Sequence, residues 1–229
     1  MKIDIAGIDF FFLTTDPDGK RKRHMVEQFG HLRLTEVHPV MGIPRAQSGA
    51  TGFARMIDAG LRRQDRARPF QPFGMFEDDV VRFRDFPREI EVPDDADILY
   101  VGLSRFGMDR DLGSHFNRVY YSDTVGDVVR IYNMLSMHGA IVCSAAGAAA
   151  LQRSMMEAYF KNIVWDVFTA QIQPYYNVYA LKIPLVHQLA AIGGQEAFTR
   201  VTIRDIPNVP IPPDDRNAVN VSVITCRAG

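Results

Sequence analysis

The chain has 229 residues, of which 47% are hydrophobic and 23% charged, and its formal net charge is -1. A chain of this length can bury a sizeable core, either as one large domain or as a domain with a small appendage. The near-neutral charge gives no electrostatic reason to expect a nucleic-acid partner. The two cysteines, Cys143 and Cys226, lie far apart, which argues against a disulfide scaffold and for a reducing compartment.

Two further signals concern the location of the protein. The N-terminus has no charged leader followed by a long apolar segment, so a signal peptide is not expected. No stretch approaches the roughly 20 apolar residues that are needed to span a bilayer. The sequence therefore predicts a cytoplasmic protein without a transmembrane segment and with at most peripheral membrane contact.

The pattern of apolar and turn-forming residues predicts strands that alternate with helices. In the first half we expect strands at 8–13, 32–40 and 73–77 and helices at 20–29 and 51–63, with Thr51 as a cap and a loop at 41–49. In the second half we expect strands at 97–102, 118–121, 138–144 and 178–186 and helices at 145–159 and 164–173.

This alternation predicts an α/β fold, in which a central, mainly parallel sheet carries helices on both faces. We expect one domain over residues 1–192. The tail, residues 193–229, contains Pro207, Pro210, Pro212 and Pro213, which argue against regular structure there. We expect this tail to be an extended arm that packs on the domain.

Three consecutive carboxylates, Glu77, Asp78 and Asp79, directly follow the expected strand at 73–77. Adjacent anions cannot be buried unpaired, and oxygen ligands suit Mg²⁺ and Mn²⁺. One interpretation is a metal and diphosphate site at the carboxyl edge of the sheet, where open α/β sheets bind ligands. The other is a solvated acidic turn. A neutral His187 at the end of a later strand could complete a metal site, or could simply be hydrogen bonded there.

Three other segments could take part in such a site. The basic turn 20–24, which includes Arg21, could grip a diphosphate, or could be a solvated helix face. The small residues of 47–53 could let a ligand approach the backbone, and close helix–strand packing explains them equally well. Asp166 could be a general base with Trp165 as a stacking platform, or a capping residue next to a core tryptophan.

Taken in order, these segments resemble a glycosyltransferase of the GT-A type, and in particular glycosyltransferase family twenty-five, the lipopolysaccharide and collagen galactosyltransferases. The resemblance covers residues 8–190. It is carried by the opening strand with the helix 20–29, the junction 48–53, the run Glu77-Asp78-Asp79, the block 138–151, Asp166, and the ending Pro184-Leu185-Val186-His187-Gln188.

The resemblance implies an inverting, metal-dependent transfer of a sugar from a nucleoside diphosphate sugar, expected to be a UDP-sugar, to an acceptor hydroxyl. The acceptor would be a glycan or lipid-linked glycan in surface polysaccharide or lipopolysaccharide synthesis. The implied roles fall into three groups: Asp79, Glu77 and His187 as ligands of Mn²⁺ or Mg²⁺; Asp166 as the base; and Thr14, Arg21, Gly49, Thr51 and Asp78 as contacts of the donor.

Two other functions stay open. The family's Ser-His in its second helix is absent near Arg55, and Asp16 stands in a loop where the family usually has arginine. These departures leave room for a non-catalytic sugar- or protein-binding module on the same fold. A nucleotidyltransferase also needs paired carboxylates and Mg²⁺, but its Gly- and Lys-rich signature is not found near the N-terminus.

Overall fold

The computed structural model describes residues 1–16, 19–104, 106–108, 115–116, 119–124 and 126–188. The helices in this part of the chain are α1 (Lys20–Phe29), α2 (Arg45–Arg62), α3 (Ala145–Lys161) and α4 (Trp165–Ile172). The strands are β1 (Lys2–Asp4), β2 (Asp9–Leu13), β3 (Arg33–Val37), β4 (Phe73–Glu77), β5 (Val80–Arg82), β6 (Glu89–Glu91), β7 (Ile98–Tyr100), β8 (Gly107–Met108), β9 (His115–Phe116), β10 (Tyr121–Asp123), β11 (Val128–Ile131), β12 (Gly139–Val142), β13 (Val178–Leu181) and β14 (Val186–Gln188).

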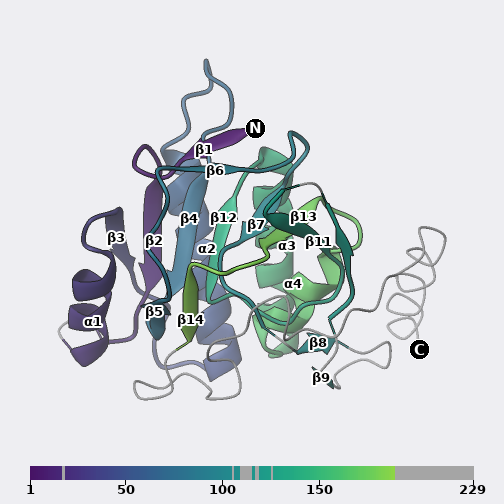
Figure 1. The fold of residues 1–229 in the computed structure, drawn as a ribbon. Coiled ribbons are helices and arrows are strands. Elements are labelled where there is room, and N and C mark those ends of the chain that lie inside the picture. Colours follow the sequence, from purple (N-terminus) through teal and green to yellow (C-terminus); the bar gives the residue numbers. More distant parts are fainter. Residues whose placement is uncertain (17–18, 105, 109–114, 117–118, 125, 189–229) are drawn as a thin grey trace, which may run out of the picture.

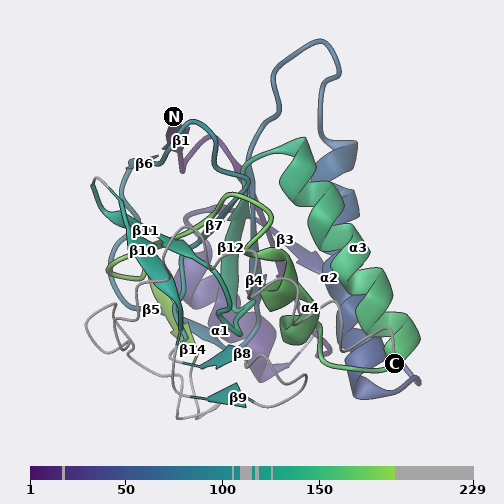
Figure 2. The same ribbon diagram turned by 90° about the vertical axis from the view of Figure 1, so that its right-hand side faces the viewer.

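An eight-stranded sheet, in the order β10-β11-β13-β7-β12-β4-β2-β3, runs through the middle of the molecule. Helices α2, α3 and α4 cover one face, and α1 covers the other together with the short ribbons β1–β6 and β5–β14 (Figures 1 and 2). The prediction of an α/β fold with helices on both faces is therefore confirmed. None of the helices in the described segments is long and apolar enough to cross a bilayer.

The prediction of a mainly parallel sheet is wrong. Four of the seven neighbouring strand pairs are antiparallel, because β12 runs against both β4 and β7, and β11 runs against both β10 and β13. The parallel pairs are β2–β3, β2–β4 and β7–β13. The apolar runs that suggested parallel strands are explained by burial of these strands on both faces of the sheet. A strand covered on both faces looks the same in either direction, so the sequence pattern could not separate the two cases.

The chain order around β2 is the part of the topology that positions the site. From β2 the chain passes through α1 to β3 on one side, then through α2 to β4 on the other side. All three strands are parallel. The carboxyl ends of β2 and β4 therefore form a topological switch point, which is where open α/β sheets place their ligands.

Helix α1 begins and ends as predicted, whereas α2 begins at Arg45, six residues before the expected start. The residues 45–49, expected in a loop, are therefore helical. Thr51 does not cap the helix; it lies inside it, where its hydroxyl donates to the carbonyl of Ser48 at 2.7 Å and accepts from the amide of Val40 at 2.9 Å. The small residues that suggested a loop allow close packing, since a Cβ at Gly49 would collide with the ring of Trp165.

The expected strand at 178–186 is two strands. Val178–Leu181 forms β13 in the central sheet, and the chain then turns so that β14 pairs with β5 in a separate ribbon. Where a strand was expected at 118–121, β10 begins at Tyr121, and residues 117–118 lie outside the described part of the chain. The expected arm 193–229 and the domain boundary at 192 also lie outside it.

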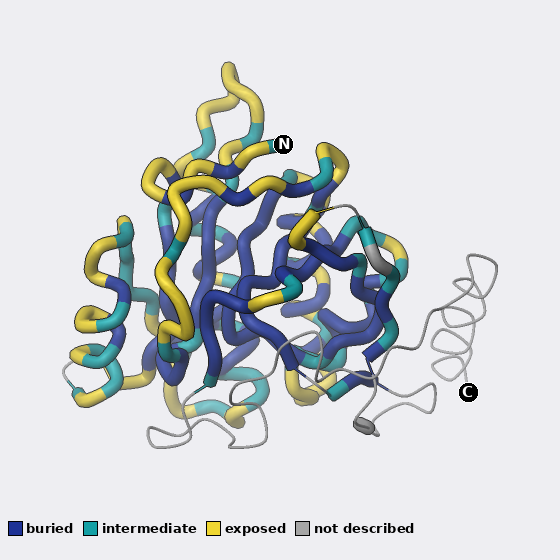
Figure 3. Tube along the Cα trace, viewed as in Figure 1, coloured by how far each residue is buried: buried dark blue, intermediate teal, exposed yellow. Residues whose placement is uncertain are grey.

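The core is divided by the central sheet into two layers of side chains. Along β2, Phe11 faces the α2 and α3 side, and Phe10 faces the α1 side, as alternation along a strand requires. On the α1 side, Phe76 stacks between Phe10 and Phe29, with ring centroids 5.2 and 5.0 Å apart. The central strands of the sheet are buried along their length (Figure 3). This rigid layer fixes the position of the residues that follow β2 and β4.

A Gly74→Ala substitution should destabilise the fold. A Cβ at Gly74 would collide with the ring of Phe10, which cannot withdraw because it is stacked on Phe76. Overpacking of this kind costs about 1–3 kcal/mol, to be measured by urea unfolding. Gly7→Ala is the control: its nearest contact would be the carboxylate of Asp4, an exposed side chain that can move, and it should change the unfolding free energy by less than about 0.5 kcal/mol. Equal effects of the two substitutions would contradict this packing.

Candidate functional site

The acidic run lies where β4 leaves the sheet. Glu77, the last residue of β4, is paired in register with Leu13 of β2, and its amide donates to the carbonyl of His138. Asp78 and Asp79 then form a tight turn into β5. These two residues are only 5% and 8% exposed, so the alternative of a solvated acidic turn is wrong.

Two side chains from distant parts of the sequence hold this turn. Arg21, in the first turn of α1, places Nη1 2.7 Å from Oδ1 of Asp78. Gln188, in β14, donates from Nε2 to Oε2 of Glu77 at 2.8 Å. Because β14 pairs with β5, Gln188 stands opposite Val80, directly after the turn. The first turn of α1 and the β5–β14 ribbon therefore frame the carboxylates from two sides.

Asp166 joins this group from the first turn of α4. Burial, followed by the charge of Asp79, raises the pKa of Asp166 to about 7. Burial and the charges of Asp79 and Asp166 raise the pKa of Glu77 well above its usual value. The pKa of Asp79 is raised by burial, against the opposing effect of Arg21. The fold thus brings Asp166 close enough to Glu77 and Asp79 for their charges to interact.

Four acidic side chains make up this group, called the carboxylate cluster below. Its members are Glu77, Asp78, Asp79 and Asp166, and the guanidinium of Arg21 is ion-paired with Asp78 and acts against the rise in the pKa of Asp79. Buried oxygens of three members, Asp78 Oδ2, Asp79 Oδ1 and Asp166 Oδ1, accept no hydrogen bond from any described residue. Such groups cost free energy unless a proton or a cation satisfies them.

The donor set suits a divalent cation. Carboxylate oxygens are the ligands that Mg²⁺ prefers, and it is usually held by one or two carboxylates plus substrate phosphates. Over the described residues, no three His, Cys, Asp or Glu side chains converge as a preformed metal site.

His187 precedes Gln188 in β14, and its side chain lies on the opposite side of that strand from the carboxylate cluster. Its ring packs against Phe83 at 4.3 Å between centroids, whereas the neighbouring Gln188 faces Glu77. This is the alternation expected along a strand. Burial, followed by the charge of His187, lowers the pKa of His138 to about 3. His138 and the hydroxyl of Ser136 share a hydrogen bond of 2.8 Å. A metal-ligand role for His187 stays a prediction.

The remaining residues assigned to the donor lie on the surrounding elements. Thr14 follows β2 at the switch point and is fully buried, and its hydroxyl accepts from the amide of Asp16 at 3.1 Å. Gly49 packs under Trp165, whose ring also lies 5.4 Å from that of Phe53. Gly49 and Trp165 therefore have a packing role, which was the alternative to ligand contact for both residues. Thr51 likewise bonds within α2 and to the segment before it. Donor contacts by these residues stay predictions.

Two residues of the site were missed by sequence reasoning. In the sequence, Gln188 was noted only as part of a motif. Its contact with Glu77 depends on the pairing of β14 with β5, which a local sequence pattern does not predict. Tyr100 lies in β7, and its pKa is raised by burial and by the charge of Asp166. Its hydroxyl also receives a hydrogen bond from Gln173 at 3.4 Å. In the sequence it is one more apolar residue of a buried strand.

Two sequence comparisons find no relative for this chain. No protein-family model matches it, and no curated protein matches its sequence significantly. The functional interpretation therefore depends on the geometry of the carboxylate cluster and on its place in the fold.

Neutralising Asp166 should stabilise the protein at alkaline pH. Folding raises the pKa of Asp166 to about 7. The contribution of Asp166 to the free energy of unfolding is therefore fully present below the ordinary aspartate pKa, about 4, and is lost as the pH rises through 7. Asp166→Asn should therefore be more stable than the native protein at pH 8, by at least about 1 kcal/mol, with a smaller difference at pH 5.

Urea unfolding in EDTA at both pH values measures this difference. Asp85→Asn, which removes an exposed carboxylate ion-paired with Arg82, controls for the change in net charge. A difference between Asp166→Asn and the native protein that does not grow from pH 5 to pH 8 would show that folding does not perturb Asp166.

Proposed function

We propose that the protein is a metal-dependent glycosyltransferase that uses a nucleoside diphosphate sugar. The observation that carries this proposal is the carboxylate cluster: two buried and two half-buried carboxylates lie together near Arg21, and three of their buried oxygens accept no hydrogen bond from the described residues. A divalent cation would offer positive charge directly to these oxygens, suits oxygen ligands, and could bind a diphosphate at its other coordination positions.

The position of the cluster supports the same proposal. It lies at the carboxyl ends of β2 and β4, which form the topological switch point. Arg21, in the first turn of α1, lies at the same edge of the sheet. Nucleotides bind at such switch points in open α/β sheets, and helix N-termini favour phosphates. In the proposed complex, Thr14 and the first turn of α1 lie along the diphosphate.

The proposed division of roles follows from the surroundings of each carboxylate. Asp79, assisted by Glu77 or Asp78, would hold Mg²⁺ or Mn²⁺, which when bound neutralises the charge of the leaving diphosphate. Asp166 would take the proton of the acceptor hydroxyl, because a base works best when its pKa lies near the working pH and that of Asp166 is about 7. Gln188 would keep Glu77 oriented.

The finer parts of the proposal come from the resemblance to GT-A glycosyltransferases of family twenty-five. They are a UDP-sugar donor, inversion at the anomeric carbon, a glycan or lipid-linked glycan acceptor, and a cytoplasmic location with peripheral access to the membrane. The parallel unit β2–β3–β4 with α1 and α2 on opposite faces suits a GT-A-like nucleotide-binding half, although the sheet as a whole is mostly antiparallel.

UDP with Mn²⁺ should raise the melting temperature, by about 5 °C or more at a hundredfold excess over its dissociation constant. Asp79→Ala should abolish this rise, because it removes the carboxylate assigned to the metal. Differential scanning fluorimetry measures both, with Asp85→Ala as a matched control whose rise should equal that of the native protein. If neither UDP nor GDP stabilises the native protein with Mn²⁺ present, the proposed function is wrong.

Asp166→Asn should lower kcat for sugar transfer by about 100-fold or more, since an amide cannot take the acceptor proton. The variant should keep the thermal shift with UDP and Mn²⁺, because the metal is assigned to Asp79. The rate is measured as UDP released from UDP-sugars in the presence of acceptor glycans. A native protein that binds UDP with Mn²⁺ but releases none from any donor would instead be the non-catalytic binding module.

A further inference from the structure

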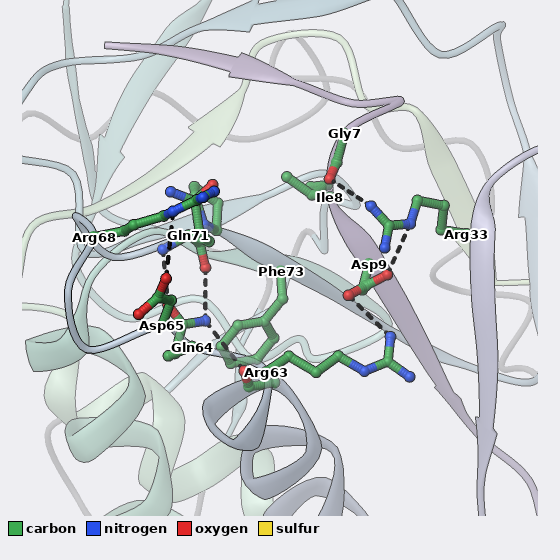
Figure 4. Close-up of a pocket in the computed structure, with 12 residues that line it drawn as sticks. Gly7, Ile8, Asp9, Arg33, Arg63, Gln64, Asp65, Arg68, Gln71 and Phe73 are labelled. Carbon is green, nitrogen blue, oxygen red and sulfur yellow. Dashed lines mark hydrogen bonds and ion pairs between the residues drawn. The ribbon is translucent and has the colours of Figure 1, made fainter.

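A second polar site lies at the opposite end of β2 and β4. The two strands begin there at Asp9 and Phe73, and Glu77 is four residues along, so the site is roughly 13 Å from the carboxylate cluster. A pocket of about 240 Å³ opens between the start of β2, the start of β3, the end of α2 and the loop that leads into β4 (Figure 4). Pockets for drug-sized ligands occupy about 300–1,000 Å³, so this pocket suits a smaller ligand.

The charged side chains that line the pocket carry an excess of positive charge. Three guanidinium groups, of Arg33, Arg63 and Arg68, face two carboxylates, of Asp9 and Asp65. Figure 4 shows Arg68 on one side of the pocket and Arg33 and Arg63 on the other. An anion between them would meet donors from two directions, and arginine is the side chain best suited to hold phosphate or carboxylate oxygens.

Two of the three guanidinium groups are fixed in place by one carboxylate. Asp9 is 3.0 Å from Nε of Arg33 through Oδ1 and 2.9 Å from Nη1 of Arg63 through Oδ2. Arg63 also lies over the ring of Phe11, 4.9 Å from its centroid, and bonds to the hydroxyl of Thr35. Groups that are already ordered lose less entropy when a ligand binds.

Donors remain available after these contacts. A guanidinium has five N–H donors. Arg33 uses Nε for Asp9 and Nη1 for the carbonyl of Gly7, and its Nη2 has no hydrogen-bond partner among the described residues. Arg68 uses Nε for Asp65, which leaves both of its terminal nitrogens within the described part of the chain. The pocket therefore has unused donors on both of its sides.

The loop that presents Arg68 is closed by its own hydrogen bonds. Oε1 of Gln64 accepts from the amide of Gln71 at 2.8 Å, and Nε2 of Gln64 donates to the carbonyl of Gln71 at 3.0 Å. Within the loop, Oδ1 of Asp65 accepts from the amide of Ala67 at 2.9 Å. These bonds hold the two ends of the loop together, so Arg68 projects from a shaped segment.

We propose that this pocket binds a tetrahedral oxyanion: inorganic phosphate, or the phosphate of a small phosphomonoester. The oxygens of a tetrahedral anion point in several directions, so one anion can reach Arg68 on one side and Arg33 on the other. A planar carboxylate presents both oxygens on one side and can reach only one of them. The site is separate from the carboxylate cluster, needs no metal, and does not depend on the proposed transferase activity.

Isothermal titration of the full chain with inorganic phosphate, in EDTA and at constant ionic strength, tests the proposal. Saturable binding in the millimolar range or tighter is expected, with weaker binding of acetate. Arg33→Gln and Arg68→Gln should each weaken phosphate binding at least about tenfold, since each removes a charge-assisted hydrogen bond. Titration with a hexose 6-phosphate in parallel shows whether the free ion or an ester is the better ligand; either result supports the site.

Two control variants test whether phosphate binds in this pocket or elsewhere on the protein. Arg66→Gln removes the same charge from the same loop, and Arg66 does not line the pocket. It should leave phosphate affinity unchanged, as should Asp79→Ala in the carboxylate cluster. The proposal is overturned if phosphate binding does not saturate, if Arg66→Gln weakens it as much as Arg68→Gln, or if only Asp79→Ala changes it. A failure of the UDP and Mn²⁺ experiment would leave this result unaffected.

Discussion

Burial of the turn at Asp78 and Asp79 is the constraint around which the rest of the site is arranged. The carboxylates cannot be solvated there, so the fold brings Arg21 from α1 and Gln188 from β14 to meet them. The contact of Gln188 could not form without the β5–β14 ribbon, which places the last described strand against the chain that leaves β4. Three buried oxygens of the carboxylate cluster still accept no hydrogen bond from the described residues.

Close packing between α2 and α4, on the face of the sheet opposite α1, positions the fourth carboxylate, that of Asp166. Helix α2 carries glycines where α4 and β2 approach it, and Gly49 lets the ring of Trp165 lie directly on the helix. Asp166 follows Trp165 in the chain, so the depth of that contact sets how close Asp166 comes to Asp79. Small residues in α2 thus help to set the position of α4, which carries Asp166.

The parallel pair β2–β4 separates two regions of opposite charge. Its carboxyl end carries the carboxylate cluster, and its amino end carries the arginines around Asp9. Both regions are framed by loops that the rigid aromatic layer holds at fixed positions. A ligand at one end would not need to displace a ligand at the other.

The sequence by itself determined the local elements, because they depend on near neighbours: helix α1, the buried strands, and the acidic run directly after β4 follow from periodicity and turn residues. The resemblance to GT-A glycosyltransferases led us to expect Glu77, Asp79 and Asp166 in one site, and the fold brings their charges close enough to interact. Only the tertiary structure decided the direction of β12, the start of α2, the contact of Gln188 with Glu77, and the side of β14 on which His187 lies. These features depend on which strands become neighbours, and strand pairing between distant segments leaves no mark in a local pattern.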